Sequence, residues 1–208
     1  MRFRILDLLS PPACAACDTR LEREAVFCPS CAGAFVPTPP HVVRGLPVFA
    51  AGAYGGPLAD AVQRLKFGDR PDLARPLGDL LRAVAQRSGL ACDLVVPVPL
   101  HRRRRLERGY NQAALLARSV TQTVEARLDV DALERLRADG PQAALRAAAR
   151  AQNVEGAFAV RPGRSLQGCR VLLVDDVVTT GATAEACAVA LQNGGATTVA
   201  VLCVARVQ

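Results

Sequence analysis

Three features that would have identified other functions are missing from the sequence. No run of about 18 uncharged apolar residues occurs, which excludes a membrane-spanning helix. Asp7 breaks the short apolar stretch at the start of the chain, so we expect no signal peptide and a cytoplasmic protein. His41 and His101 are the only histidines, and Ser-His-Asp and glycine-rich nucleotide motifs are absent, so the sequence identifies no catalytic residue and no general base.

Lysine is also nearly absent. Lys66 is the only lysine among 26 cationic side chains, and such an excess of arginine usually reflects genomic base composition. Most of the arginines therefore say little about function. A lysine retained in such a chain suggests that a compact ammonium group is needed at that position.

The residues that are present predict a globular protein. Half of the 208 residues are apolar and 22% are charged, which is typical of a folded chain with a sizeable core. The net charge of +7 is concentrated in residues 102–108, where five arginines are opposed only by Glu107. The basic character is therefore local to one short stretch.

Four of the eight cysteines lie close together near the N-terminus. Two Cys-x-x-Cys pairs, separated by ten residues, are formed by Cys14, Cys17, Cys28 and Cys31. This spacing can place four thiolates around one ion, and a closed set of four thiolates is typical of structural zinc. Disulfides suit a cytoplasmic protein poorly, and a redox pair or an iron–sulfur cluster is a further alternative. We expect Zn²⁺ to supply the folding free energy of this small module.

Prolines divide the chain into two parts. Four of them between residues 37 and 47 hold the backbone extended. We therefore expect a zinc-ribbon module over residues 1–36, a proline-rich linker over 37–47 and a main domain over 48–208. Zinc ribbons serve as structural staples or bind nucleic acid or protein, and the nearly balanced charges around the cysteines indicate no phosphate-binding face.

The main domain carries the pattern of an α/β fold. Residues 171–174 are a continuous aliphatic run, typical of a parallel strand buried on both faces. Asp175 and Asp176 follow this run, and residues 179–183 form a turn into a helix that we expect to end at Gly194. Ligands of open α/β sheets bind at the carboxyl ends of the strands, so the two acids mark a candidate site.

The turn itself has the chemistry of a phosphate site. Unpaired N–H groups and the helix dipole favour an anion at the N-terminus of a helix. Gly181 allows close approach, and the hydroxyls of Thr179, Thr180 and Thr183 add hydrogen-bond donors. The neighbouring carboxylates can hold vicinal hydroxyls or Mg²⁺. A sugar phosphate matches both features, whereas an ordinary capped helix does not explain two consecutive acids.

The arginine run follows a second apolar strand, at residues 94–98. A cationic loop leaving this strand would meet an anionic pyrophosphate at the same edge of the sheet. A solvated face or an RNA-binding patch is the alternative, but no aromatic residues are interleaved with the arginines. Further along, Arg146 and Arg150 belong either to a lid that supplies cations to the leaving group or to a surface helix without a chemical role.

The stretch VLLVDDVVTTGAT closely resembles the phosphoribosyl-pyrophosphate (PRPP) binding motif of the type I phosphoribosyltransferases. The resemblance implies an α/β fold, with a parallel sheet flanked by helices. It also implies that Asp175 and Asp176 contact the ribose hydroxyls. The turn around the 5′-phosphate would consist of Thr179, Thr180, Gly181, Ala182 and Thr183.

The whole chain contains, in order, the cysteine pairs, YGGPLADAVQRLKFGD, VVPVPLHRRRRLERGYNQ, PQAALRAAARAQNVEGAF and VLLVDDVVTTGAT. This order of motifs resembles that of the ComF family of competence-associated, zinc-ribbon phosphoribosyltransferase-like proteins. Tyr110 replaces the family's usual phenylalanine, and Asp139 and Gly140 stand where a threonine is usual. The family's recurring residues fall on Lys66, Arg104, Arg108, Gly109, Asn111, Gln112, Gln142, Arg150 and Asn153. The resemblance implies a role in DNA uptake with a helicase-type partner.

We therefore expect Mg²⁺-dependent transfer of a phosphoribosyl group from PRPP to an unidentified acceptor. The expected phosphate and pyrophosphate contacts are Lys66, Arg104, Arg108, Arg146 and Arg150. The alternative is a non-catalytic module that binds a sugar phosphate or single-stranded DNA and docks DNA-uptake partners through its zinc ribbon. The intact acidic pair favours the enzyme, while the basic run and the ribbon favour the binding module.

Overall fold

The computed structural model describes residues 12–136 and 156–208. The helices are α2 (Pro29–Gly33), α3 (Gly56–Phe67), the short 3₁₀ helix η1 (Pro71–Leu73), α4 (Ala74–Arg87), α5 (Arg102–Arg108), α6 (Gln112–Val124) and α8 (Ala182–Asn193). The strands are β1 (His41–Val43), β2 (Leu46–Ala53), β3 (Leu94–Pro97), β4 (Arg127–Leu128), β5 (Leu133–Arg135), β6 (Phe158–Val160), β7 (Arg170–Val178) and β8 (Thr198–Arg206). None of these helices is long and apolar enough to cross a membrane.

Six strands form one sheet in the order β1-β2-β8-β7-β3-β4. All neighbours are parallel except β1, which pairs antiparallel with β2. Strands β5 and β6 form a separate antiparallel ribbon. The expected α/β class is therefore confirmed, and residues 171–174 lie in a central strand as their aliphatic run predicted.

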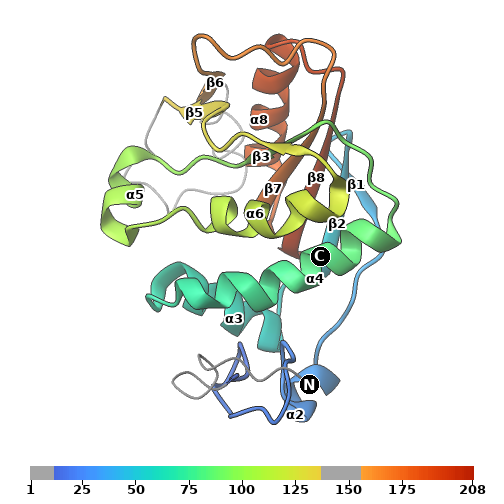
Figure 1. The fold of residues 1–208 in the computed structure, drawn as a ribbon, viewed down its shortest axis with the longest axis vertical. Helices are drawn as coiled ribbons and strands as arrows, with labels where there is room; N and C mark the ends of the chain where they lie inside the picture. The colour runs from blue at the N-terminus through green and yellow to red at the C-terminus, as the bar shows by residue number, and fades with distance from the viewer. Residues whose placement is uncertain (1–11, 137–155) are drawn as a thin grey trace.

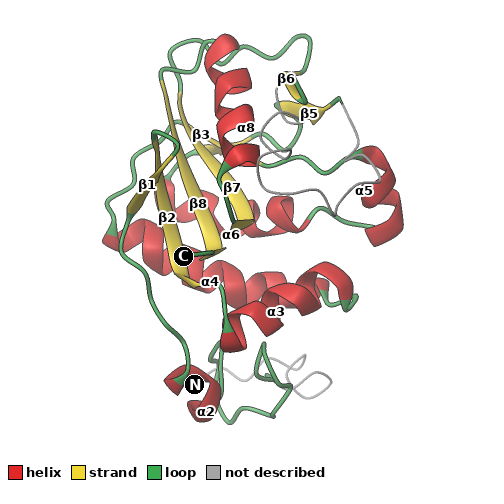
Figure 2. Ribbon diagram, turned by 180° about the vertical axis from the view of Figure 1, so that it is seen from behind, coloured by secondary structure: helices red, strands yellow, loops and turns green. Residues whose placement is uncertain are grey.

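Side chains of β7 alternate between two hydrophobic cores, because successive residues of a strand point to opposite faces. Leu172 and Val174 belong to the core shared with α3, α4 and α6. Val171 and Leu173 belong to the core shared with α8. The result is a three-layer arrangement, with α4 and α6 in front of the strands in Figure 1 and α8 in front of them in Figure 2.

Three segments differ from the expected local structure. Strand β7 continues to Val178, so Asp175 and Asp176 lie within the strand and not beyond it. The arginine run, which was expected to be a loop, forms the helix α5. The segment expected to be a linker contains β1 and the start of β2.

Local capping explains the helix at the arginine run. His101 precedes it in an extended conformation, and its Nδ1 accepts a hydrogen bond from the Arg103 N–H at 3.2 Å. Gly109 ends it at a φ of +75°, a value that glycine adopts without strain, and its N–H donates to the Arg105 carbonyl. Arginine is a good helix former, so a run of four suits the interior.

The N-terminal cysteine module packs on α3. Cys14, Phe27 and Cys28 are buried in the same core as Leu58 and Val62 of α3. Figure 1 shows the module and α2 at the opposite end of the molecule from β5 and β6, next to α3. The module is therefore part of the packed structure.

Candidate functional site

A buried carboxylate lies at the centre of the site. Asp176 is only 2% exposed, and its Oδ1 is 2.9 Å from the ammonium nitrogen of Lys66. Its Oδ2 is also buried and has no hydrogen-bond partner among the residues that the structure describes. A buried oxygen without a partner costs free energy, so native proteins usually satisfy such atoms or use them to bind a ligand. Strand β7 supplies the acid and the end of α3 supplies the single lysine.

Asp175 is half-buried beside Asp176 on the same strand. Its Oδ1 accepts a hydrogen bond from the Asp176 N–H at 2.8 Å. Burial and the negative charge of Asp176 raise the pKa of Asp175 to about 8, although Lys66 opposes the shift. Hydroxyl donors or a divalent cation would favour the ionised carboxylate and so would bind here with proton release.

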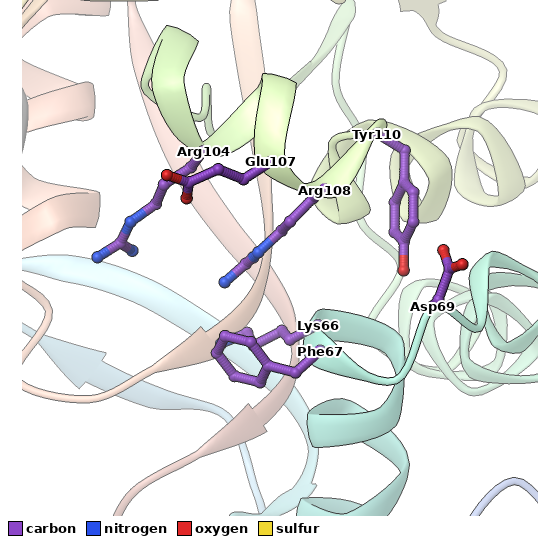
Figure 3. A pocket seen from close by; sticks show the side chains of 7 residues that line it. All are labelled: Lys66, Phe67, Asp69, Arg104, Glu107, Arg108 and Tyr110. Atoms are coloured by element: carbon purple, nitrogen blue, oxygen red, sulfur yellow. The ribbon is translucent and has the colours of Figure 1, made fainter.

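A cavity of about 470 Å³ opens between α3 and α5. The Arg108 side chain from α5 points across this cavity toward Lys66 and Phe67 at the end of α3 (Figure 3). The residues that line it are Lys66, Phe67, Asp69, Arg104, Glu107, Arg108 and Tyr110. The Arg108 guanidinium stacks 4.7 Å from the centre of the Phe67 ring. Burial lowers the pKa of Arg108, and the nearby charge of Asp176 opposes this shift. The ion pair of Lys66 with Asp176 connects the cavity wall to the buried acid.

Hydrogen bonds fix the segment that follows α5. The Tyr110 hydroxyl donates to the Leu65 carbonyl at 2.6 Å and so joins the segment after α5 to α3. Asn111 caps α6, with its Oδ1 accepting from the Ala113 N–H at 3.0 Å and its Nδ2 donating to the Val98 carbonyl at 3.1 Å. The hydroxyl that distinguishes Tyr110 from the family's usual phenylalanine therefore has a partner.

The turn after β7 begins α8 with Gly181 in the left-handed region at a φ of +77°. A Cβ at Gly181 would lie 2.5 Å from Val43 Cγ1, so only glycine fits. Arg44 lies on the outer side of the turn, where its Nε donates to the Thr180 carbonyl at 2.8 Å and its Nη1 pairs with Glu185 at 2.7 Å. Sequence reasoning missed Val43 and Arg44, because the contact joins residues 136 positions apart and no local pattern signals it.

The structure brings together some of the expected residues and separates others. Lys66, Arg104 and Arg108 line the cavity next to Asp176. The turn of residues 179–183 is at the N-terminus of α8 and does not line that cavity. Arg146 and Arg150 lie outside the described residues.

The cysteine cluster fits a tetrahedral metal site. The four sulfur atoms lie within 4.8 Å of one another, and two of the separations from Cys17, to Cys28 and to Cys31, are 3.8 Å. Tetrahedral bonds of about 2.3 Å to zinc would place the sulfurs about 3.8 Å apart. Hydrogen bonds with Thr19 lower the pKa of Cys17 to about 6, whereas burial and the neighbouring thiols raise that of Cys31. A divalent cation would allow all four thiols to ionise.

Comparison with known proteins finds a matching family model and similar solved structures. The family model of the phosphoribosyl transferase domain matches residues 107–208, which include α6, β7 and the turn into α8. The structure of an allosteric regulatory enzyme of purine biosynthesis is similar over 68% of this chain and 30% of that chain, with 23% identity and a TM-score of 0.48.

Two curated relatives match most of the chain. DNA utilization protein YhgH of Escherichia coli O6:H1 is 33% identical over 208 aligned residues, which cover 93% of this chain and 89% of the relative. Competence protein F of Haemophilus influenzae is 30% identical over 178 residues, which cover 83% of this chain and 75% of the relative. These alignments therefore include many residues outside 107–208, the range that the domain model matches.

Proposed function

Because the chain belongs to the ComF family of competence-associated, phosphoribosyltransferase-like proteins, we propose that it binds PRPP with Mg²⁺ and transfers the phosphoribosyl group to an acceptor nucleophile. The observation that carries the proposal is Asp176. Its carboxylate is buried, one oxygen is paired with the only lysine, and the other has no partner among the described residues. Such an oxygen is suited to accept a hydroxyl donor from a ligand.

The proposed roles follow from the positions of the residues. Asp175 and Asp176 accept hydrogen bonds from the ribose hydroxyls, and the N–H groups of residues 179–183 hold the 5′-phosphate. The cations that contact the pyrophosphate are Lys66, Arg104 and Arg108, with Arg146 and Arg150 proposed from the segment outside the described residues. Mg²⁺ bound with the ligand neutralises charge on the pyrophosphate, and the two acids are the side chains suited to hold it.

The proposed reaction exchanges one bond at the ribose C1′ carbon. The bond from C1′ to the pyrophosphate oxygen breaks, and the electron pair leaves with pyrophosphate. The acceptor forms the new bond to C1′, and its proton passes to pyrophosphate or water. The chain contributes positioning of the ligand and electrostatic stabilisation of the departing pyrophosphate by the cations that line the cavity.

Calorimetric titration with PRPP and Mg²⁺ tests the binding step. We expect the wild type to bind, and the double substitution Asp175→Asn plus Asp176→Asn to weaken binding by about a hundredfold or more. Asp93→Asn is the matched control, because it changes the acid that directly precedes β3 at the amino edge of the sheet. Binding that survives the double substitution would overturn the assignment. Release of pyrophosphate with a pool of small nucleophiles then tests the transfer step.

We further propose that Cys14, Cys17, Cys28 and Cys31 hold one Zn²⁺. The support is the spacing of the sulfur atoms, and the metal would supply folding free energy to a module with little core of its own. Metal analysis should find one zinc per purified chain. A content well below one equivalent in freshly purified protein would contradict the proposal.

The names of the relatives, DNA utilization protein and Competence protein F, support a role in competence and the handling of DNA. A helicase-type partner and a cytoplasmic location are proposed from the sequence alone. Direct binding of single-stranded DNA by α5 is less well supported. Arg104 and Arg108 face the cavity beside α3, whereas Arg105 lines a separate cavity of about 650 Å³. Arginines divided in this way do not form one continuous face for a nucleic-acid backbone.

A further inference from the structure

Two basic side chains near the end of α3 have different partners. Lys66 pairs with Asp176 in the site. Arg64, two residues earlier, faces the cysteine module, where its Nη1 donates to the carbonyls of Ala15 at 3.2 Å and Ala16 at 3.0 Å. These carbonyls belong to the two residues between Cys14 and Cys17, so Arg64 binds the backbone of the first Cys-x-x-Cys turn.

Asp18 strengthens the same attachment from the next position of the module. Its carboxylate pairs with the Arg64 Nη2, and its Oδ1 accepts a hydrogen bond from the Arg70 Nη1 at 2.9 Å. Arg64 and Arg70 lie on either side of the residue that enters the site, Lys66. The module therefore holds the chain both before and after the end of α3.

The end of a helix is the part that most easily opens, because its last carbonyls have no partners within the helix. In α3, Gly68 donates to the Arg64 carbonyl at 2.9 Å, and Tyr110 donates to the Leu65 carbonyl. A lysine side chain has four rotatable bonds, so its ammonium stays beside a buried carboxylate only if its backbone is fixed. The contacts of Arg64 supply that fixation from the side opposite the site.

We propose that the cysteine module braces the end of α3 through Arg64 and thereby positions the Lys66 ammonium against Asp176. Arg64 is then a positioning residue that acts through Lys66 and touches no ligand. The module contributes to the acid site without contributing an atom to it. The consequence for ligand affinity rests on the proposed function, but the positioning of Lys66 is independent of it.

The single lysine allows a direct measurement. In protein labelled at the lysine side chain with ¹³C and ¹⁵N, Lys66 gives the only lysine ammonium signal in the NMR spectrum. We expect Arg64→Met to accelerate hydrogen exchange of this ammonium by about tenfold or more, because the pairing with Asp176 is loosened. Arg75→Met is the matched control, since Arg75 joins α4 to Glu24 of the same module at 3.0 Å but lies outside α3. It should leave the signal unchanged.

Two results would overturn the proposal. One is an Arg64→Met protein with the wild-type zinc content and an unchanged Lys66 signal. The other is an equal acceleration in Arg75→Met, which would indicate a general loosening of the module. If Arg64→Met does not fold, Arg64→Gln keeps some hydrogen-bonding capacity and should show a smaller change in the same direction.

A double-mutant cycle extends the test to the ligand. Binding of PRPP and Mg²⁺ is measured by calorimetry. Introduced into the wild-type chain, Arg64→Met should weaken this binding by about tenfold. Introduced into a chain that already carries Lys66→Met, it should weaken binding by less than about twofold. Equal losses in both backgrounds would show that Arg64 does not act through Lys66. A wild type that fails to bind PRPP would refute the proposed function and leave the NMR measurement to decide the positioning role.

Discussion

Carboxylates lie at both the amino and the carboxyl edge of the sheet, where the strands begin and end, but their pKa values are shifted in opposite directions. At the amino edge, Asp93 accepts three hydrogen bonds from Arg170, at 2.8 Å, 3.1 Å and 2.8 Å, and this pairing lowers its pKa to about 2. Toward the carboxyl edge, Asp176 pairs with Lys66, and burial together with the charge of Asp176 raises the pKa of Asp175 to about 8. Strand β7 contributes to both edges, so its backbone does not cause the difference. The amino edge is saturated, because Arg170 occupies both carboxylate oxygens of Asp93. The carboxyl edge is the binding edge and has unused capacity, because Asp176 Oδ2 has no hydrogen-bond partner among the described residues.

Removing Lys66, the partner of Asp176, should have the largest effect on this comparison. Lys66→Met leaves the Asp176 carboxylate buried without its ion-pair partner, so we expect the free energy of unfolding to fall by about 2–3 kcal/mol at neutral pH. Urea denaturation measures this loss. Arg75→Met, which breaks an exposed pair with Glu24, should cost less than about 1 kcal/mol. Equal losses in the two variants would mean that the lysine does not compensate a buried charge.

Asp175→Asn should have a smaller effect and of the opposite sign. The unfolded chain releases the Asp175 proton near pH 4, whereas the folded chain keeps it until about pH 8. This carboxyl therefore makes the wild type less stable as pH rises between these values. Asparagine removes the dependence and should stabilise the protein by about 1–2 kcal/mol at pH 8, with little difference at pH 4.

Urea denaturation of the wild type and Asp175→Asn at several pH values measures the difference directly. Effects of pH on the cysteine module are common to both proteins and cancel in the comparison. The same substitution should weaken the binding of PRPP, because a site with unused capacity trades stability for affinity. An Asp175→Asn protein that is less stable than the wild type at pH 8 would contradict the raised pKa.

Much of the fold could be predicted because its signals are local. The aliphatic run at residues 171–174 and the glycines that bound α8 specify a buried strand and the following helix without reference to other segments. The spacing of the cysteines likewise predicts their cluster, which the structure shows. Local signals fail where a competing preference exists. The arginine run was interpreted by its charge, but the cap formed by His101 makes it a helix.

The contacts that build the site from distant segments could not be predicted. Arg44 reaches Thr180, Tyr110 reaches Leu65 and Arg64 reaches the first cysteine pair. Each is a single side chain that donates to a backbone carbonyl, and such a contact leaves no periodic pattern in the sequence. Lys66 is the exception, since its rarity in an arginine-rich chain marked it before its partner Asp176 was known.

The smallest effect is expected at the saturated edge. Asp93→Asn keeps an oxygen acceptor for Arg170 and loses only the charge. We therefore expect a small fall in the melting temperature at neutral pH. This fall should be smaller in size than the rise that Asp175→Asn causes at pH 8. The contribution of the wild-type pair is fully present above about pH 4 and disappears as pH falls toward 2, so the two proteins should converge in acid. Because both side chains are about half exposed, 50% for Arg170 and 43% for Asp93, high salt should also reduce the difference. A salt-independent loss as large as that of Lys66→Met would mean that both edges depend on buried charge, and the contrast between a saturated edge and a binding edge would no longer hold.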